Sequence, residues 1–220
     1  MTDRAARARP GLSPSQTVGP FFHDCLLRPA PAAPAGPELR SGPAGPKGPD
    51  ARRNVLVQPE TAGERIRIEG RVLDGDGVGV PDALVEIWQA NSHGHYHHPA
   101  DTRTALALDP SFTGFGRSGT DEAGRYWFET IRPGAVPFDD ARMQAPHICV
   151  MVFARGLLNH LVTRLYFADE PASEADPVLR RVPAERRGTL MARPETVDGR
   201  TLYRWDIILQ GVRETAFFNQ

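Results

Sequence analysis

From Glu64 onward the chain consists of short runs of β-branched and aromatic residues that are separated by turn signals. Ile66, Ile68 and Val72 alternate with polar residues, and the turn sequence 74–77 and the apolar run 84–88 follow them. Such spacing is typical of a sandwich of antiparallel strands. Further strands are expected at 126–128, 147–153, 161–167 and 203–209, and a short helix with surface loops at 171–193. We therefore predict an all-β fold over residues 64–220, an antiparallel β-sandwich with long loops.

The first part of the chain has a different amino-acid composition. Residues 1–12 are rich in Arg, Ala and Pro without periodicity, which predicts a flexible leader. Residues 13–63 are expected to form an extended N-terminal arm and a Pro/Gly-rich loop. The collagen-like triplets at 42–50 are too few to hold a triple helix, so a surface loop is the better interpretation.

Composition excludes several classes of partner. The 220 residues carry 26 basic and 27 acidic side chains, so the chain offers no electrostatic footprint for nucleic acid or an anionic membrane. No apolar run approaches the roughly 20 residues of a membrane helix, and the start has no apolar signal-peptide core. Cys25 and Cys149 lie in unrelated contexts. We expect a soluble cytoplasmic protein that acts on a small molecule or another protein.

The densest group of imidazoles is His93, His95, His97 and His98. An extended backbone would place three of them on one side, but neighbouring Ser and Gly residues favour a loop. No acidic or thiol ligand lies at a fixed spacing from them. We therefore expect solvated loop residues, and an independent metallohydrolase that uses this cluster and His147 stays an alternative.

Five motifs point to a known family. They are Trp-Gln-Ala-Asn at 88–91, Gly-Arg-Tyr at 124–126, Thr-Ile-Arg-Pro-Gly at 130–134, Phe-Ala-Arg-Gly at 153–156 and Thr-Arg-Leu-Tyr-Phe at 163–167. Together they resemble the intradiol aromatic-ring dioxygenases, and the resemblance runs from about Ser13 to the carboxyl terminus. It implies a β-sandwich fold and the cleavage of an aromatic diol with O2.

The resemblance also bears on the metal. Iron-bearing members of the family hold Fe(III) with two tyrosinates and two histidines, which are ligands suited to that ion. The matching positions here are Thr104 (or Arg103 if the loop shifts by one), Val136, His147 and Cys149, and Gln144 replaces an arginine that accompanies the iron. Because loss of a supporting partner alone weakens a metal site about 10- to 100-fold, loss of three ligands predicts no metal in this chain. We expect no catalytic residue in it, and His147 and Cys149 as buried strand residues.

Four residues are expected to contact substrate. An isolated arginine such as Arg155 is more often solvated or ion-paired, but the resemblance implies that its guanidinium meets the substrate carboxylate. The segment that contains Thr17, Gly19 and Pro20 reads on its own as an irregular arm laid over a surface. The resemblance places these three residues against the aromatic ring, where Gly19 permits a close approach and Pro20 fixes it.

The function implied by the resemblance is that of a non-iron (alpha) subunit. It assembles with a beta subunit that carries Fe(III), in a higher-order alpha–beta oligomer. The complex cleaves protocatechuate (3,4-dihydroxybenzoate) with O2 to 3-carboxy-cis,cis-muconate, in the beta-ketoadipate pathway of aromatic degradation. The alternative is a non-catalytic β-sandwich that serves as a binding or assembly module.

Overall fold

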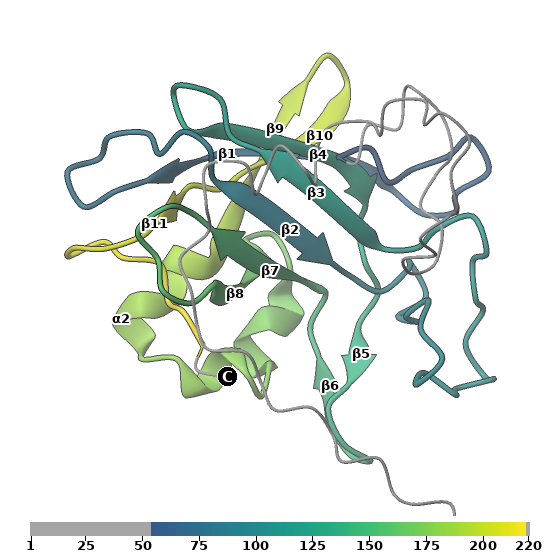
Figure 1. Ribbon diagram of the computed structural model, residues 1–220. Coiled ribbons are helices and arrows are strands. Elements are labelled where there is room, and N and C mark those ends of the chain that lie inside the picture. The colour runs from purple at the N-terminus through teal and green to yellow at the C-terminus, as the bar shows by residue number, and fades with distance from the viewer. Residues whose placement is uncertain (1–53, 219–220) are drawn as a thin grey trace, which may run out of the picture.

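The computed structural model describes residues 54–218 (Figure 1). The predicted leader at 1–12 and most of the predicted arm and loop at 13–63 lie outside this range. Over the described residues the strands are β1 (Arg65–Leu73), β2 (Leu84–Trp88), β3 (Phe115–Gly119), β4 (Arg125–Ile131), β5 (Val136–Pro137), β6 (Met143–Gln144), β7 (His147–Phe153), β8 (Leu161–Phe167), β9 (Met191–Val197), β10 (Arg200–Arg204) and β11 (Ile207–Ile208).

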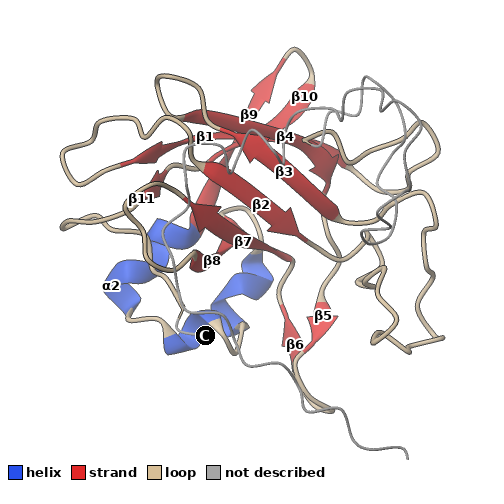
Figure 2. Ribbon diagram, viewed as in Figure 1, coloured by secondary structure: helices blue, strands red, loops and turns tan. Residues whose placement is uncertain are grey.

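In the part of the chain that the structure describes, helical structure is confined to one segment between β8 and β9. It comprises the 3-10 helices η1 (Pro171–Ala175), η2 (Leu179–Arg181) and η3 (Gly188–Leu190) and the single-turn helix α2 (Ala184–Arg187). Figure 2 shows these turns together beside β7 and β8, away from β1 and β4. Among residues 54–218, no helix has the length and apolar character needed to cross a membrane.

Nine strands form one continuous sheet. Its order is β11-β1-β10-β9-β8-β7-β2-β3, with β4 paired to β1, and β5 and β6 form a separate two-stranded ribbon. Side-chain alternation decides which face is buried: Ile148, Val150 and Val152 of β7 are at most 1% exposed and pack with Ile68 and Phe128 in the core. Burial of each such side chain contributes about 1.5–3 kcal/mol. The core therefore fixes which β7 residues face outward.

The predicted all-β class is confirmed, and the predicted strands at 84–88, 147–153 and 161–167 are β2, β7 and β8. Most neighbouring strands are antiparallel as predicted, but β1 runs parallel to β10 and β11, and β8 runs parallel to β9. The prediction of one strand at 203–209 was wrong. The Trp205 amide still donates to the Glu69 carbonyl, but the next β1 amide, that of Arg71, donates to the Asp206 side chain and not to the backbone, so β10 and β11 are separate.

Candidate functional site

The site lies on the outward face of the sheet, at the amino-terminal end of β7. Strand register places Trp88 of β2 beside Cys149 of β7, and Cys149 beside Arg164 of β8. These three side chains form one row, because directly opposed residues in a sheet lie on the same face. Two residues earlier in β7, His147 lies beside Tyr166 in the next row.

His147 is a buried strand residue, as predicted, with 3% exposure. Its Nδ1–H donates to the Ala145 carbonyl oxygen at 2.7 Å, a direction that follows because a carbonyl only accepts. Burial, reinforced by the charge of Arg164, lowers the pKa of His147 to about 4. The imidazole is therefore neutral at neutral pH. Cys149 was also predicted to be buried, but its solvent exposure is intermediate. Its partial burial raises the pKa of the thiol.

A series of hydrogen bonds connects Arg164 of this row to the buried side chain of Asp176. Arg164 Nη1 donates to Gln144 Oε1 at 2.8 Å and to the Tyr166 hydroxyl at 3.4 Å, and that hydroxyl donates to Asp176 Oδ1 at 3.1 Å. Asp176 is fully buried and also accepts the amides of Ala145, Val178 and Leu179. The carboxylate therefore ties the entry of β7 to the helical segment.

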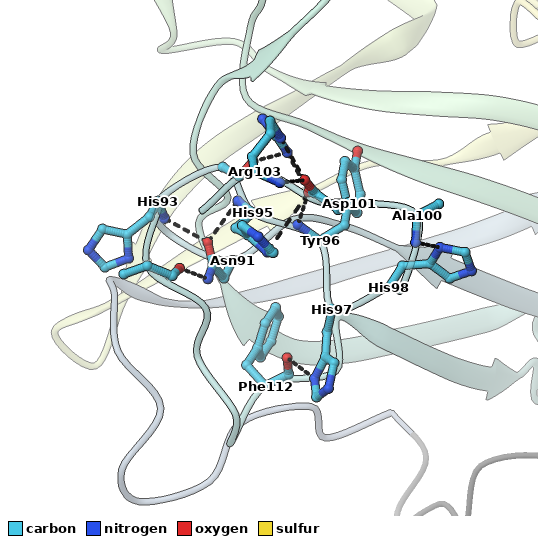
Figure 3. A network of polar contacts seen from close by, with 12 residues as sticks. Asn91, His93, His95, Tyr96, His97, His98, Ala100, Asp101, Arg103 and Phe112 are labelled. Atoms are coloured by element: carbon cyan, nitrogen blue, oxygen red, sulfur yellow. Dashed lines mark hydrogen bonds and ion pairs between the residues drawn. The ribbon is translucent and has the colours of Figure 1, made fainter. Parts of the chain in front are cut away.

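The loop between β2 and β3, part of which Figure 3 shows, contacts the row through Tyr96. The Tyr96 ring packs against Trp88 with 4.7 Å between centroids. Asp101 holds the loop by accepting the Tyr96 amide at 2.9 Å and Arg103 Nε at 2.7 Å, and Arg103 Nη2 donates to the Gly94 carbonyl. The Arg103 guanidinium also keeps the pKa of Asp101 well below its usual range.

The histidines of this loop do not converge. His93, His97 and His98 are exposed as predicted, but the prediction is wrong for His95, which is 7% exposed. The reason is the side chain of Asn91, whose Oδ1 accepts the amides of both His93 and His95 and turns the backbone inward. Within residues 54–218, no group of three or more His, Cys, Asp or Glu side chains is placed to hold a metal ion.

The donor set at the family's metal-ligand positions does not fit Fe(III). Thr104 is exposed, Val136 is buried and apolar, and Arg103 is engaged with Asp101. Two phenols contact the row, those of Tyr96 and Tyr166, but burial raises the pKa of each far above the usual value, so both are neutral. The charged side chain beside Cys149 in the sheet is that of Arg164. The described residues therefore offer a cationic pocket and not a ligand shell for a metal.

The four predicted substrate-contacting residues are not brought to this pocket by the described structure. Arg155 follows the opposite end of β7 from Cys149, roughly 20 Å away at about 3.3 Å per residue. Its side chain is 57% exposed, and its guanidinium pairs with Asp82 Oδ2 at 2.8 Å. Thr17, Gly19 and Pro20 lie outside the described residues, so their predicted contact with a ring stays a prediction.

Three residues of the pocket were missed as individual contributors. Arg164 was noted only as part of the motif at 163–167, although its period-2 spacing from Tyr166 places both on one face. Tyr96 and Asp176 gave no signal in the sequence. Their role depends on contacts with Trp88 and Ala145, which are formed across the fold.

Comparison with known proteins shows the family to which the chain belongs. A family model described as Dioxygenase matches residues 37–211. The chain is 40% identical over 210 residues to the protocatechuate 3,4-dioxygenase alpha chain of Pseudomonas putida and 41% identical over 211 residues to that of Burkholderia cepacia, each match covering 94% of this chain and 96% of the relative. It is also 40% identical to the Burkholderia cepacia beta chain over 168 residues, which cover 74% of this chain and 71% of that one.

Solved structures give the same assignment of fold. The dioxygenase domain of a carbohydrate-binding fusion protein from Streptomyces sp. SirexAA-E superposes with a TM-score of 0.56 at 25% identity, over 82% of this chain and 98% of that one. Hydroxyquinol 1,2-dioxygenase from Pseudomonas putida DLL-E4 superposes with a TM-score of 0.58 at 20% identity, over 86% and 70%, respectively. The chain therefore belongs to the dioxygenase family, as an intradiol ring-cleavage dioxygenase homologue.

Proposed function

We propose that this chain is the alpha subunit of a protocatechuate 3,4-dioxygenase and that a beta subunit holds the ferric site. One observation carries the proposal: the chain matches alpha chains over 94% of its length, while its own metal-ligand positions hold Thr104, Val136 and Cys149. The relative named as a beta chain is a homologue of this chain, which supports a complex built from two related subunits. The complex of the two subunits assembles in the cytoplasm.

In this complex, Arg155 binds the carboxylate of protocatechuate. Its position supports this role, because the guanidinium is exposed at the end of β7 and the ion pair with Asp82 leaves its other N–H donors able to meet a second anion. Charge-assisted bonds of this kind orient a planar substrate. We propose that Thr17, Gly19 and Pro20 contact the aromatic ring of the same substrate.

The ferric ion supplies activation of the aromatic diol toward O2 when it is bound by the beta subunit. This chain binds the substrate and orients it. The products of ring cleavage contain both atoms of O2, so 3,4-dihydroxybenzoate and O2 give 3-carboxy-cis,cis-muconate without another reductant. Since the arm and loops of this chain would reach across its neighbour, we expect the alpha–beta contact to exceed roughly 2,000 Å², as in permanent complexes.

Arg155→Ala in the assembled complex tests the substrate role. Loss of a charge-assisted contact of about 1.5–3 kcal/mol lowers kcat/KM for protocatechuate about 10- to 150-fold. Catechol lacks the carboxylate, so its kcat/KM is expected to fall much less. Arg125→Ala is the matched control, because it removes another exposed arginine, whose ion pair among the described residues is with Asp121 on a turn. An equal loss for both substrates would contradict the role given to Arg155.

Co-expression with the partner tests the assembly. The complex is expected to purify as one species with iron, and the chain purified alone is expected to contain no stoichiometric iron. A chain that stays folded and monomeric in the presence of its partner would instead support the non-catalytic binding module. One iron per lone chain, with a tyrosinate absorption band in the visible range, would also refute the proposal.

A further inference from the structure

The pocket at the former metal-ligand positions has an electrostatic character opposite to that of a metal site. Two guanidinium groups, from Arg103 and Arg164, approach it from different elements. The side chain beside Arg164 in the sheet is the thiol of Cys149, and the ring that packs on Trp88 is the phenol of Tyr96, so neither neighbour is a carboxylate.

Arg164 reaches the pocket with unused donors. Both of its hydrogen bonds to described residues, to Gln144 and Tyr166, use Nη1, and each acceptor is neutral. Within the described part of the chain Arg164 forms no ion pair. The nearby carboxylate of Asp176 lies behind Tyr166 and is already occupied by four donors. The Nε–H and Nη2–H donors of Arg164 therefore have no acceptor among residues 54–218.

Arg103 contributes a second unused donor. Its Nε and Nη2 are engaged by Asp101 and the Gly94 carbonyl, whereas its Nη1 is buried without a hydrogen-bond partner among the described residues. A buried donor without a partner costs about 1–3 kcal/mol, so such groups call for an acceptor. Figure 3 shows the Arg103 guanidinium and the Tyr96 hydroxyl extending toward the same side of the loop.

Arg164 and Arg103 both lie near the Tyr96 hydroxyl, because the charge of each opposes the rise that burial causes in the pKa of this phenol. The Tyr96 ring packs on Trp88, whose neighbour in the sheet is Cys149, and Arg164 is the next residue in the same row. Tyr96 is also adjacent to Arg103 through the shared carboxylate of Asp101. The aromatic rings of Trp88 and Tyr96 form an apolar wall beside the unused donors.

We propose that this pocket binds a small oxyanion between the guanidinium groups of Arg103 and Arg164, beside the Tyr96 hydroxyl. A carboxylate or a phosphate has the lone pairs that these donors require, and planar guanidinium groups bind both with paired hydrogen bonds. The site is separate from Arg155 and does not depend on the proposed ring-cleavage function. Its ligand would be an inorganic oxyanion or, because of the aromatic wall, an aromatic carboxylate.

Isothermal titration calorimetry of the full chain, purified with its partner, tests the site. Inorganic phosphate and benzoate are titrated separately, at an ionic strength held constant with chloride. The decisive variant is Gln144→Glu, because the new carboxylate takes the position of an oxygen that already lies 2.8 Å from Arg164 Nη1. This internal anion is expected to weaken binding at the site at least tenfold, and the loss of the hydrogen bond from Gln144 Nε2 to the Pro137 carbonyl limits any gain in melting temperature.

Gln58→Glu is the matched control. It makes the same change of charge on an exposed residue, whose backbone oxygen already contacts the guanidinium of Arg65. Unchanged binding in this variant is expected. Arg164→Gln should abolish the same site, and if that variant does not fold, Gln144→Glu still decides.

The outcomes separate the possible ligands. A site that binds benzoate and not phosphate identifies an aromatic carboxylate, and the reverse identifies an inorganic oxyanion. The proposal is overturned if neither anion gives saturable binding that Gln144→Glu removes. It is also overturned if Gln58→Glu weakens binding as much as Gln144→Glu does. Ring cleavage is not the readout, so failure here would leave the proposed function untouched.

Discussion

Asp176→Asn is expected to be among the most damaging isosteric substitutions in this protein. Asp176 is fully buried, and its two oxygens accept four hydrogen bonds, three from backbone amides and one from Tyr166. The amide side chain of Asn has the same shape, but one of its two polar atoms is a donor. In either orientation, that donor faces at least one N–H or O–H group that it cannot satisfy.

The magnitude follows from the better of the two orientations. If the Asn oxygen keeps the amides of Val178 and Leu179, its NH2 group faces the amide of Ala145, which lies 2.8 Å from Asp176 Oδ2. Loss of one charge-assisted bond costs about 1.5–3 kcal/mol, and a buried amide left unpaired costs about 1–3 kcal/mol. Relief of the desolvation of a buried charge offsets part of this, so we expect a net loss of about 3 kcal/mol.

Urea denaturation followed by circular dichroism and tryptophan fluorescence measures the loss. The midpoint is expected to fall with an unchanged m value, because the substitution alters stability and not the surface exposed on unfolding. Hydrogen exchange should accelerate first at the amide of Ala145, which loses its acceptor. Asp121→Asn is the control, since Asp121 accepts the amides of Ala123 and Arg125 in an exposed turn. If both variants lose the same small amount of unfolding free energy, the conclusion that Asp176 holds β7 to the helical segment is refuted.

Two further perturbations test other parts of the structure. The pKa of His147 is lowered from 6.5 in the unfolded chain to about 4 in the folded chain, so on acidification the unfolded chain binds the proton at a higher pH. The free energy of unfolding is therefore at its highest above pH 6.5 and falls by about 3 kcal/mol as the pH is lowered to 4. His147→Asn should remove this slope in denaturation curves collected between pH 4 and 7, and an unaltered slope would show that other groups cause it. Gly70→Ala should lower the melting temperature strongly, because its Cβ would overlap the Trp205 carbonyl, whereas Gly188→Ala, which has open space around the added carbon, should not. Similar melting temperatures for the two glycine variants would contradict the close packing of β1 against the segment between β10 and β11.

The strands that could be predicted are those with a buried face. In β7, the alternation of Ile148, Val150 and Val152 with outward residues is local, so the pattern marks the strand without knowledge of its neighbours. β9 could not be found this way. Its residues from Arg193 onward are exposed, and it is a strand because its backbone pairs with β10, where Glu195 meets Leu202 in register. Exposed strands of this kind take their conformation from the ladder and not from their own side chains.

At the substrate and metal positions too, some features could be predicted from the sequence and others depend on the fold. The identities of Thr104, Val136 and Cys149 could be read along the chain, and they sufficed to argue against a metal site. The buried position of His95 could not be read, because it depends on the two hydrogen bonds that Asn91 accepts within its own loop. Nor did the sequence indicate that Arg155 would meet Asp82, which precedes a different strand.

The sequence by itself determined the all-β class, the family and the residues at each former ligand position, because these depend on local periodicity and on the order of residues. The tertiary structure alone decided that Arg164, Tyr96 and Arg103 share one pocket. Their proximity arises from the register of β2, β7 and β8 and from the packing of the 91–103 loop on Trp88. Contacts of this kind are set by burial of the opposite face of the sheet, so the chemistry of the outward face follows from a core in which it takes no part.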